Sequence, residues 1–256
     1  MIHPQAIIEP GAIIGKNVTI GPWTKVASNV TIGDNCHISS HVVINGPTKI
    51  GQGNRIFQFA SIGEDCQDLK YAGEPTELII GDNNIFRECC TIHRGTLQDN
   101  SLTQIGNNNL FMAYTHVAHD CMVGSHCIMA NNASIAGHVH VGDHVILGGM
   151  SGVHQFCHVG AHSFIAANAI VLKDVPAYVM ASGHPAKPFG LNSEGLKRRG
   201  FTSDILLSIK RAYKEIYRKK QSVDDALQAI SEQGTPSSEL ELFTHSIKKS
   251  TRGIIR

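Results

Sequence analysis

The sequence predicts an all-β parallel β-helix over residues 1–190, followed by a small α-helical domain over residues 191–256. Three observations favour this fold class. An aliphatic residue recurs at every sixth position through most of the first 175 residues. The 256 residues include 25 glycines but only 6% aromatic residues, which is typical of short strands and frequent turns rather than of an ordinary globular core. After residue 190, helix-capping signals take the place of the repeat.

The repeat is uninterrupted at ten successive sixth positions: Ile8, Ile14, Ile20, Val26, Ile32, Ile38, Ile44, Ile50, Ile56 and Ile62. It resumes at Ile80 and again from Ile105 to Val171. A period of six is too short for a helical repeat, but it suits a prism of short parallel strands in which three repeats make one coil. The aliphatic residue and the small residue four positions later are therefore expected to point inward.

The third residue after each aliphatic position falls at a corner between strands, where the backbone needs permissive angles. Asn, Gly or His commonly stands there, as at Asn17, Asn35, Gly53, Asn83, His126 and His144. His126, His144 and His162 form a ladder on one corner, and because His simply replaces Asn or Gly, we expect no metal there. Five of the seven cysteines fall at the inward small position and are expected to be inert core residues: Cys36, Cys90, Cys121, Cys127 and Cys157.

Two insertions, at residues 64–79 and 93–104, interrupt the repeat. If each replaces a single corner, the strands that precede them lie on one face, together with the strands that end at Val117, Ile135 and Val153. Both loops then project from one edge of the prism. The same edge receives a glycine and four histidines: Gly137, His93, His119, His138 and His154.

His119 and Gly137 are 18 residues apart, which places them on adjacent coils. Adjacent coils are separated by about 4.8 Å along the axis of the prism. Asp120 can fix the tautomer of the His119 imidazole, and Gly137 can offer its backbone N–H to an oxygen one coil away. Acyl transfer to a hydroxyl group needs a general base to remove the hydroxyl proton and a donor to stabilise the oxyanion, and this pair of residues could supply both. An ordinary exposed corner would explain an isolated His–Asp pair, but it would not explain the coincidence with both loops and Gly137.

Several segments resemble one family over almost the whole chain. They are SHVVINGPTKIG (40–51), FQFASIGEDCQDLKYAGEPT (57–76), TIHRGT (91–96), HVAHDC, ANNASIAGHV, VHQFC, EGLKRRGF (194–201) and the final STRGIIR. The chain is similar to the UDP-N-acetylglucosamine O-acyltransferases that start lipid A synthesis, within the hexapeptide-repeat acyltransferases. That resemblance implies a left-handed β-helix, an exception to the usual right-handed crossover.

The resemblance implies transfer of an (R)-3-hydroxyacyl chain from acyl carrier protein to the glucosamine 3-hydroxyl of UDP-N-acetylglucosamine. His119 would be the general base, Asp120 its orienting partner and the Gly137 N–H the oxyanion donor. No cofactor is implied beyond the phosphopantetheine that carries the acyl donor on acyl carrier protein, and no metal. The expected partners are acyl carrier protein, UDP-N-acetylglucosamine and two further copies in a homotrimer, with neither nucleic acid nor a membrane span.

The resemblance also assigns the remaining site residues. Asp68 and Lys70 on the first insertion would contact sugar, phosphate or the acyl hydroxyl. The cleft would be lined by His116, His138, His154 and Gln155. The uridine diphosphate would be held by Asn192, Glu194, Arg198 and Arg199, since a guanidinium can bind phosphate with two hydrogen bonds. Ala167 would set the acyl-chain length. His184–Pro185 departs from the usual Asn of relatives, so nucleotide contacts there stay open.

The charges are divided unevenly. Residues 1–192 carry 9 Lys and Arg against 13 Asp and Glu, a net −4, whereas residues 193–256 carry 13 against 8, a net +5. The basic segment is a candidate surface for an acidic partner such as acyl carrier protein. No apolar run approaches the eighteen residues of a membrane span, and MIHPQAII does not resemble a signal peptide, so a cytoplasmic protein is expected.

Helix signals divide the C-terminal segment. Thr202 or Ser203 is expected to cap a helix that runs to about Lys220, and 222–225 begins the next. Gly234 would end that second helix before a final one from about Ser237.

Three other functions fit parts of the pattern. An N-acyltransferase acting on an amino-sugar nucleotide would share the fold, although an amine nucleophile needs less help from a base. A trimeric zinc carbonic anhydrase would use three histidines at a subunit seam, and His119, His138 and His154 could imitate them. A non-catalytic trimer would leave the QDLKYAGEPT and KRRGF segments without a role.

Overall fold

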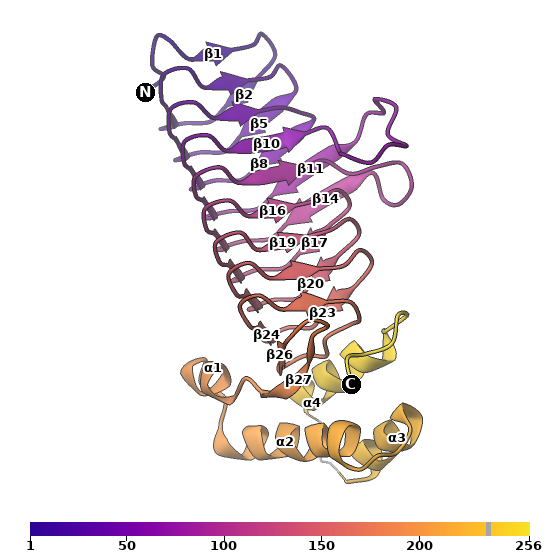
Figure 1. Cartoon of the computed structure of the whole chain (residues 1–256). Helices are drawn as coiled ribbons and strands as arrows, with labels where there is room; N and C mark the ends of the chain where they lie inside the picture. The colour runs from indigo at the N-terminus through magenta and orange to yellow at the C-terminus, as the bar shows by residue number, and fades with distance from the viewer. Residues whose placement is uncertain (234–236) are drawn as a thin grey trace.

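The computed structural model describes residues 1–233 and 237–256 and shows a left-handed parallel β-helix followed by short helices (Figure 1). Three sheets form the faces of a prism, and each coil adds one strand to each face. In the described residues the first face runs in the order β1 (Ile7–Ile8), β4 (Lys25–Val26), β7 (Val43–Ile44), β10 (Ser61–Glu64), β13 (Thr91–His93), β16 (His116–Val117), β19 (Ser134–Ile135), β22 (Gly152–Val153) and β25 (Ile170–Val171).

The other two faces follow the same progression. The second face consists of β2 (Ile13–Ile14), β5 (Val30–Ile32), β8 (Thr48–Ile50), β11 (Glu77–Ile80), β14 (Leu102–Ile105), β17 (Met122–Val123), β20 (His140–Val141) and β23 (His158–Val159). The third consists of β3 (Thr19–Ile20), β6 (His37–Ile38), β9 (Arg55–Ile56), β12 (Ile85–Phe86), β15 (Leu110–Phe111), β18 (Ile128–Met129), β21 (Ile146–Leu147), β24 (Phe164–Ile165), β26 (Val179–Ser182) and the antiparallel β27 (Lys187–Leu191).

The predicted inward positions form the core. From Ile20 to Val171, the aliphatic residues of the repeat are at most 4% exposed. Ile8 and Ile14 are only partly buried because they lie in the first coil, which has no coil above it. The five cysteines of the inward small positions are buried as well, and burial raises the pKa of Cys121 and Cys127 to about 12 and that of Cys157 to about 11. These thiols stay protonated near neutral pH, as expected of core residues.

The predicted corners adopt the left-handed backbone conformation. Asn17, Asn35 and His126 have φ of 57°, 59° and 59°. Bulky residues do the same at equivalent positions, with φ of 56° at Trp23 and 64° at Phe59. Because side chains of this size disfavour positive φ, the coil geometry imposes the conformation and the residue type follows it.

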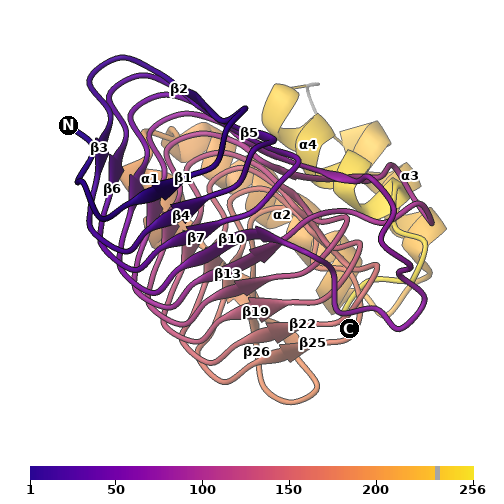
Figure 2. The same ribbon diagram turned by 90° about the horizontal axis from the view of Figure 1, so that it is seen from above.

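Both insertions replace corners between the first and second faces, and they project on the same side of the prism (Figures 1 and 2). The connecting loops are residues 65–76 and 94–101, shorter than the interruptions in the repeat. Strand pairing extends into the interruptions because Leu78 pairs with both Thr48 and Thr103 on the neighbouring coils. We call residues 65–76 the first loop and residues 94–101 the second loop.

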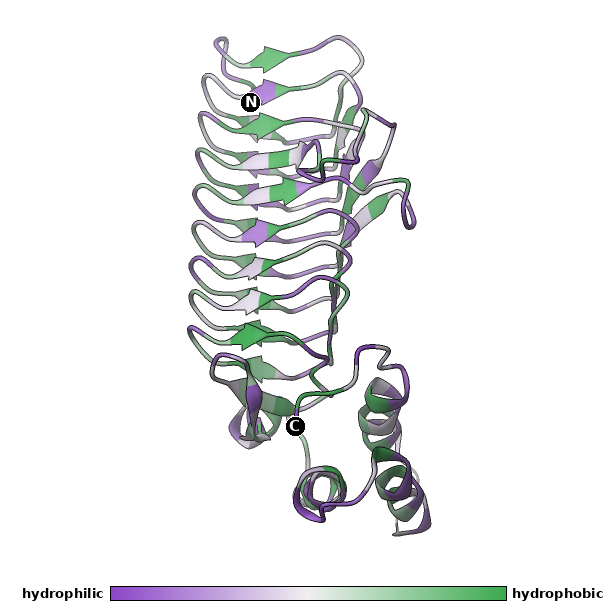
Figure 3. Cartoon of the chain, turned by 45° about the vertical axis from the view of Figure 1, so that its right-hand side comes forward, coloured by the Kyte–Doolittle hydropathy of each residue, from purple (hydrophilic) through white to green (hydrophobic). Residues whose placement is uncertain are grey.

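The C-terminal segment forms α1 (Ser193–Arg198), α2 (Ser203–Arg218), α3 (Val223–Gln233) and α4 (Ser238–Lys248), at one end of the prism (Figure 3). The predicted caps are confirmed at Thr202 and Ser237, whose side chains accept hydrogen bonds from Ile205 and Leu240. α2 ends two residues before Lys220, and Gly234 lies outside the described residues. None of the described helices combines the length and apolar character needed to cross a membrane.

Candidate active site

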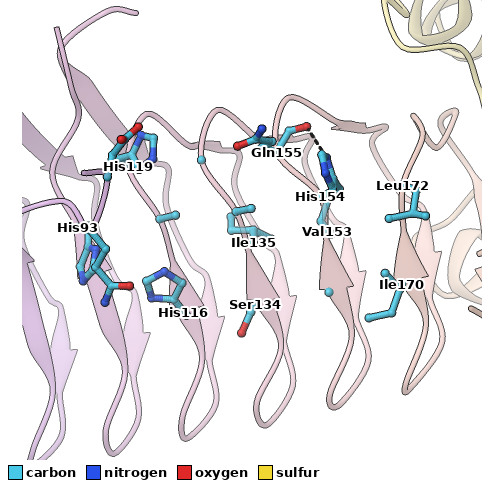
Figure 4. A pocket seen from close by; sticks show the side chains of 16 residues that line it. His93, His116, His119, Ser134, Ile135, Val153, His154, Gln155, Ile170 and Leu172 are labelled. Atoms are coloured by element: carbon cyan, nitrogen blue, oxygen red, sulfur yellow. Dashed lines mark hydrogen bonds between the residues drawn. The ribbon is translucent and has the colours of Figure 1, made fainter. Parts of the chain in front are cut away.

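A cavity of about 550 Å³ opens on the first face beside the two loops (Figure 4). Its lining begins at His93 and His116, passes His119 and Gly137 at the corner, and ends at Leu172. The strands β16, β19 and β22 are in register, with His116 opposite Ser134 and Ser134 opposite Gly152. The sequence prediction that both loops and these corner residues share one edge is therefore confirmed.

His119 and Asp120 form a directed pair at this corner. The His119 Nδ1 lies 2.8 Å from the Asp120 Oδ2, and the His119 side chain is 14% exposed against 1% for Asp120. An ionised carboxylate accepts a hydrogen bond from Nδ1–H, which leaves the Nε2 lone pair of a neutral imidazole free to accept a proton. The pair can therefore present a base to the cavity.

Asp120 is held in its ionised form by several donors. It accepts hydrogen bonds from the Thr96 N–H at 2.9 and 3.1 Å and from the Thr96 hydroxyl at 2.6 Å. Burial alone would raise the pKa of this carboxyl group, but the hydrogen bonds from His119 and Thr96 prevail and lower it below its ordinary value. Its own N–H donates to the Thr103 hydroxyl at 2.8 Å. The carboxylate therefore cannot rotate away from the imidazole without losing several bonds.

Gly137 packs directly against the His119 ring. A Cβ atom built on Gly137 would lie 2.5 Å from the Cε1 and 2.6 Å from the Nε2 of His119. Contacts this short do not occur between unbonded carbon atoms, so only glycine leaves room for the imidazole in its present place. The adjacency of the two coils, predicted from the spacing of the residues, is confirmed by the hydrogen bond from the His138 N–H to the His119 carbonyl at 3.0 Å.

The Gly137 N–H is unpaired within the described chain. On the corner between the second and third faces, the equivalent N–H groups donate to side chains of the next coil, as from Lys16 to Asp34 and from Ser125 to Asp143, each at 2.7 Å. Buried backbone donors are rarely left without an acceptor. Gly137 is buried, so its N–H is available to an oxygen atom of a ligand in the cavity.

Two further histidines in the cavity are kept neutral. Burial, followed by the neighbouring His116, lowers the pKa of His93 to about 4. Burial and His119 also lower the pKa of His116, whose Nδ1 lies 2.7 Å from the Thr91 hydroxyl. Near neutral pH these rings contribute hydrogen-bonding groups to the cavity rather than positive charge.

The cleft predicted from the sequence is brought together only in part. His116, His154 and Gln155 line the cavity, and the His154 Nδ1 lies 3.1 Å from the Gln155 carbonyl. His138 does not line it: the ring is buried behind His119, stacks on Phe156 at 4.4 Å between centroids, and has its Nδ1 3.1 Å from Asp99. Asp68 lines the cavity from the first loop, whereas Lys70 is exposed outside the lining.

The predicted nucleotide residues lie elsewhere in the single chain. Asn192 caps α1 and donates to the His162 carbonyl at 2.9 Å, and Arg199 donates to the His144 carbonyl at 3.1 Å. They therefore sit at the corner between the second and third faces, against the histidine ladder. Glu194 is exposed and bonds Lys197, and Arg198 is exposed. One chain alone does not bring this cluster to the cavity.

Ala167 is exposed on the turn that precedes β25 and does not line the cavity of the single chain. The cavity nevertheless ends at Ile170 and Leu172, which follow Ala167 closely along the chain. The acyl-length assignment to Ala167 therefore stays a prediction.

Sequence reasoning missed the residues that support the site. Thr96 was assigned no role, although it belongs to the TIHRGT segment and makes three contacts with Asp120. Gln67 and Leu172 also line the cavity. The position of Gln67 within QDLKYAGEPT was the only signal available, because loop residues have no repeat from which their direction can be read.

Among the described residues, His119, Asp120 and His138 are grouped closely enough to hold a metal ion, with ligand atoms within 4.8 Å of one another. The group differs from the histidine triad of the zinc alternative, since it lacks His154. Asp120 is already saturated by donors from Thr96 and His119, which fits a hydrogen-bonded network better than a metal ligand.

Comparisons with known proteins agree on one family. Residues 174–255 match the family model of UDP-N-acetylglucosamine O-acyltransferase, domain 2, and residues 11–46 and 102–137 match the bacterial transferase hexapeptide model. The chain is 52% identical, over 100% of its length and 99% of the relative's, to an acyl-[acyl-carrier-protein]–UDP-N-acetylglucosamine O-acyltransferase of Stutzerimonas stutzeri.

Solved structures give the same result. LpxA from Acinetobacter baumannii superposes with a TM-score of 0.98 at 53% identity, covering 100% of this chain and 99% of the other. The UDP-N-acetylglucosamine acyltransferase of Francisella novicida superposes with a TM-score of 0.97 at 46% identity, covering 100% and 94% of the two chains.

Proposed function

This chain belongs to the UDP-N-acetylglucosamine O-acyltransferase family of lipid A synthesis, and from that premise we propose that His119 and the Gly137 N–H carry out the acyl transfer. The observation that carries the proposal is their juxtaposition: an imidazole anchored by a buried carboxylate, in contact with an unpaired backbone donor. The acceptor is UDP-N-acetylglucosamine, and the donor is a thioester of acyl carrier protein.

In the first step the His119 Nε2 removes the proton from the 3-hydroxyl of the glucosamine unit as that oxygen attacks the thioester carbonyl. Asp120 holds Nδ1–H and stabilises the imidazolium that forms, without taking the proton itself. Carbon–oxygen bond formation places negative charge on the former carbonyl oxygen. The Gly137 N–H donates to that oxyanion, and donors of this kind are worth roughly 3–4 kcal/mol in the transition state.

In the second step the tetrahedral intermediate collapses, the carbon–sulfur bond breaks, and the imidazolium returns its proton to the departing thiolate of phosphopantetheine. The products are the O-acylated sugar nucleotide and the free thiol of the carrier protein. The two reaction steps balance without a cofactor and without a nucleophilic protein side chain. We propose that Asp68 and His116, which line the cavity, bind the sugar or the acyl hydroxyl, and that Lys70, which lies outside the lining, assists them.

His119→Ala tests the mechanism. We expect kcat to fall by roughly 10²-fold or more with an unchanged thermal midpoint, because general base catalysis is usually worth 10²–10⁴-fold. Turnover comparable to that of the unmodified enzyme would refute it. A parallel assay with an amino-sugar nucleotide as acceptor addresses the N-acyl alternative, since an amine should depend much less on His119.

We also propose that the working site lies between two copies in a homotrimer, since α1 lies at a different corner from the cavity. Arg198 and its neighbours would then reach the diphosphate from the adjacent copy. Inactive His119→Ala and Arg198→Ala chains can be co-expressed in equal amounts. Each mixed trimer then has one subunit interface at which both His119 and Arg198 are intact, so about one quarter of all sites should be active. No recovery in verified mixed trimers would place Arg198 in the same copy as the base.

An acyl carrier protein donor supports the expected cytoplasmic location. Carrier proteins are acidic, and α2 exposes the basic residues Lys210, Arg211, Lys214 and Arg218. We propose this side of α2 as the carrier-protein docking surface, because opposite charges steer association.

A further inference from the structure

Arg94, at the start of the second loop, carries a buried guanidinium group. Its side chain is 7% exposed, although a buried charge is costly unless it is paired and hydrogen-bonded. Nη1 donates to the Gly63 carbonyl, and Nη2 donates to the Asp65 carboxylate and to the Tyr71 hydroxyl, the last at 3.1 Å. Gly63 lies in β10 just before the first loop, and Asp65 and Tyr71 lie within the loop.

These contacts fix both ends of the stretch that faces the cavity. Gln67 and Asp68 line the cavity and stand between Asp65 and Tyr71. Leu69, at the tip of the stretch, is fully exposed, so the tip is not held by hydrophobic packing. The Tyr71 hydroxyl is also 3.1 Å from the Asp65 carboxylate and 3.0 Å from the Glu74 carbonyl. Arg94 thus closes a small polar cluster that determines where Asp68 lies.

The next two residues continue the connection toward the base. The N–H groups of Arg94 and Gly95 donate to the carbonyls of Glu64 and Glu77 at 3.1 and 3.3 Å, and the Thr96 N–H donates to Asp120. A Cβ atom on Gly95 would lie 2.2 Å from the Leu102 N, so the backbones touch there. Three consecutive N–H groups are therefore bound to the flanks of the first loop and to the carboxylate that orients His119.

We propose that Arg94 and Thr96 are positioning residues with separate targets: Arg94 places the acceptor-binding first loop, and Thr96 places the base through Asp120. This inference rests on the proposed function, because it assigns acceptor binding to Asp68 and proton transfer to His119. The second loop then connects the first loop to the base. Changes at Arg94 should affect KM for the sugar nucleotide, and changes at Thr96 should affect kcat.

The first-loop end is tested with Arg94→Lys, Asp65→Asn and Tyr71→Phe. Lysine keeps the charge but cannot donate in the three directions of the guanidinium group. Asp65 is largely exposed, so Asp65→Asn removes the ionic partner without opening a cavity and remains informative if Arg94→Lys does not fold. We expect KM for UDP-N-acetylglucosamine to rise about tenfold in each variant, with kcat changed less than about threefold.

The base end is tested with Thr96→Val and Thr96→Ser. Valine removes the hydroxyl donor to Asp120, and we expect kcat to fall roughly 10- to 100-fold with little change in KM for the sugar nucleotide. Serine keeps the hydroxyl and should restore most of kcat, which a purely structural role for threonine would not predict. Thr24→Val is the matched control. Thr24 is a buried threonine in a coil far from the cavity, and its hydroxyl donates to the Ser39 carbonyl and accepts from the Val42 N–H.

The inference is overturned if kcat and KM change together in both sets of variants, or if Thr96→Ser is as impaired as Thr96→Val at an unchanged thermal midpoint. Failure of the proposed function gives another pattern, in which His119→Ala keeps its turnover. The two outcomes are therefore distinguishable in the same assay.

Discussion

Gly137→Ala is the most direct test of how closely the base and the oxyanion donor are fitted together. The substitution adds one methyl group and leaves the backbone N–H, His119 and Asp120 chemically intact. Gly137 does not have a positive φ, so alanine can adopt its backbone angles and any effect must come from the contact with the imidazole.

The size of the effect follows from the geometry. The added Cβ would stand 2.5 Å from the His119 Cε1, whereas carbon atoms are in optimal contact at about 3.5 Å, so the ring must retreat by about 1 Å. A displacement of about 1 Å in a reacting group can cost 10²-fold in rate. The hydrogen bond from His119 to Asp120, now 2.8 Å, would also lengthen or bend. We expect kcat to fall roughly 10²-fold.

The assay follows formation of acylated UDP-N-acetylglucosamine from a 3-hydroxyacyl carrier protein, with the thermal midpoint measured in parallel. Gly149→Ala is the matched control, because a Cβ atom on this corner glycine would meet only the Asn131 carbonyl, at 3.4 Å. The control should keep its activity within about twofold. Full turnover in Gly137→Ala would show that His119 does not need its observed position, and the proposed pairing of base and donor would be wrong.

Four other outcomes are expected. Asp120→Asn should lower kcat less than His119→Ala does, because a wrongly set tautomer still samples the productive one; equal losses would contradict this. Partial burial lowers the pKa of His162 from the ordinary 6.5 to about 4, so the unfolded chain binds the extra proton and stability should fall as pH drops from about 6.5 toward 4; His162→Asn should flatten the dependence of the thermal midpoint on pH. KM for the carrier thioester should rise with salt and with charge reversal at Lys210 or Lys214, whereas indifference to salt would argue against docking on α2. Ala167→Gly should shift the preferred 3-hydroxyacyl chain about one methylene longer, since one methyl group displaces about one methylene from a close-packed groove; an unchanged profile would assign chain length to another residue.

The fold could be predicted from the sequence because a single repeat length determines several features of the structure. A spacing of six fixes which residues point inward, which stand at corners and which lie opposite each other on adjacent coils. The prediction that His119 and Gly137 meet needed only their separation of 18 residues. The prediction that the two loops lie at the same edge needed each insertion to count as one corner, which the pairing of Ile62 with Ile92 confirms.

The loops could not be predicted in the same way. Thr96 reaches Asp120 and Arg94 reaches Asp65 across 24 and 29 residues, between segments with no repeat to set their register. The corner on which α1 lies could not be predicted from the sequence either. Asn192 and Arg199 follow the last coils in sequence, but their contacts with His162 and His144 place them on another corner from the cavity.

The backbone of the prism offers similar N–H groups at every corner, and several besides that of Gly137 have no partner among the described residues, so the contact of Gly137 with the His119 ring is what singles it out. Acidic and hydroxyl side chains from the next coil accept these donors on the corner between the second and third faces, as Asp34 and Asp143 do. At Gly137 the next coil presents Gln155, whose side chain is exposed and makes no such bond within the described residues. Under the proposed mechanism, this unpaired donor binds the oxyanion. The proposed base, His119, instead needs a fixed orientation, and the second loop supplies hydrogen bonds that fix it through Thr96 and Asp120.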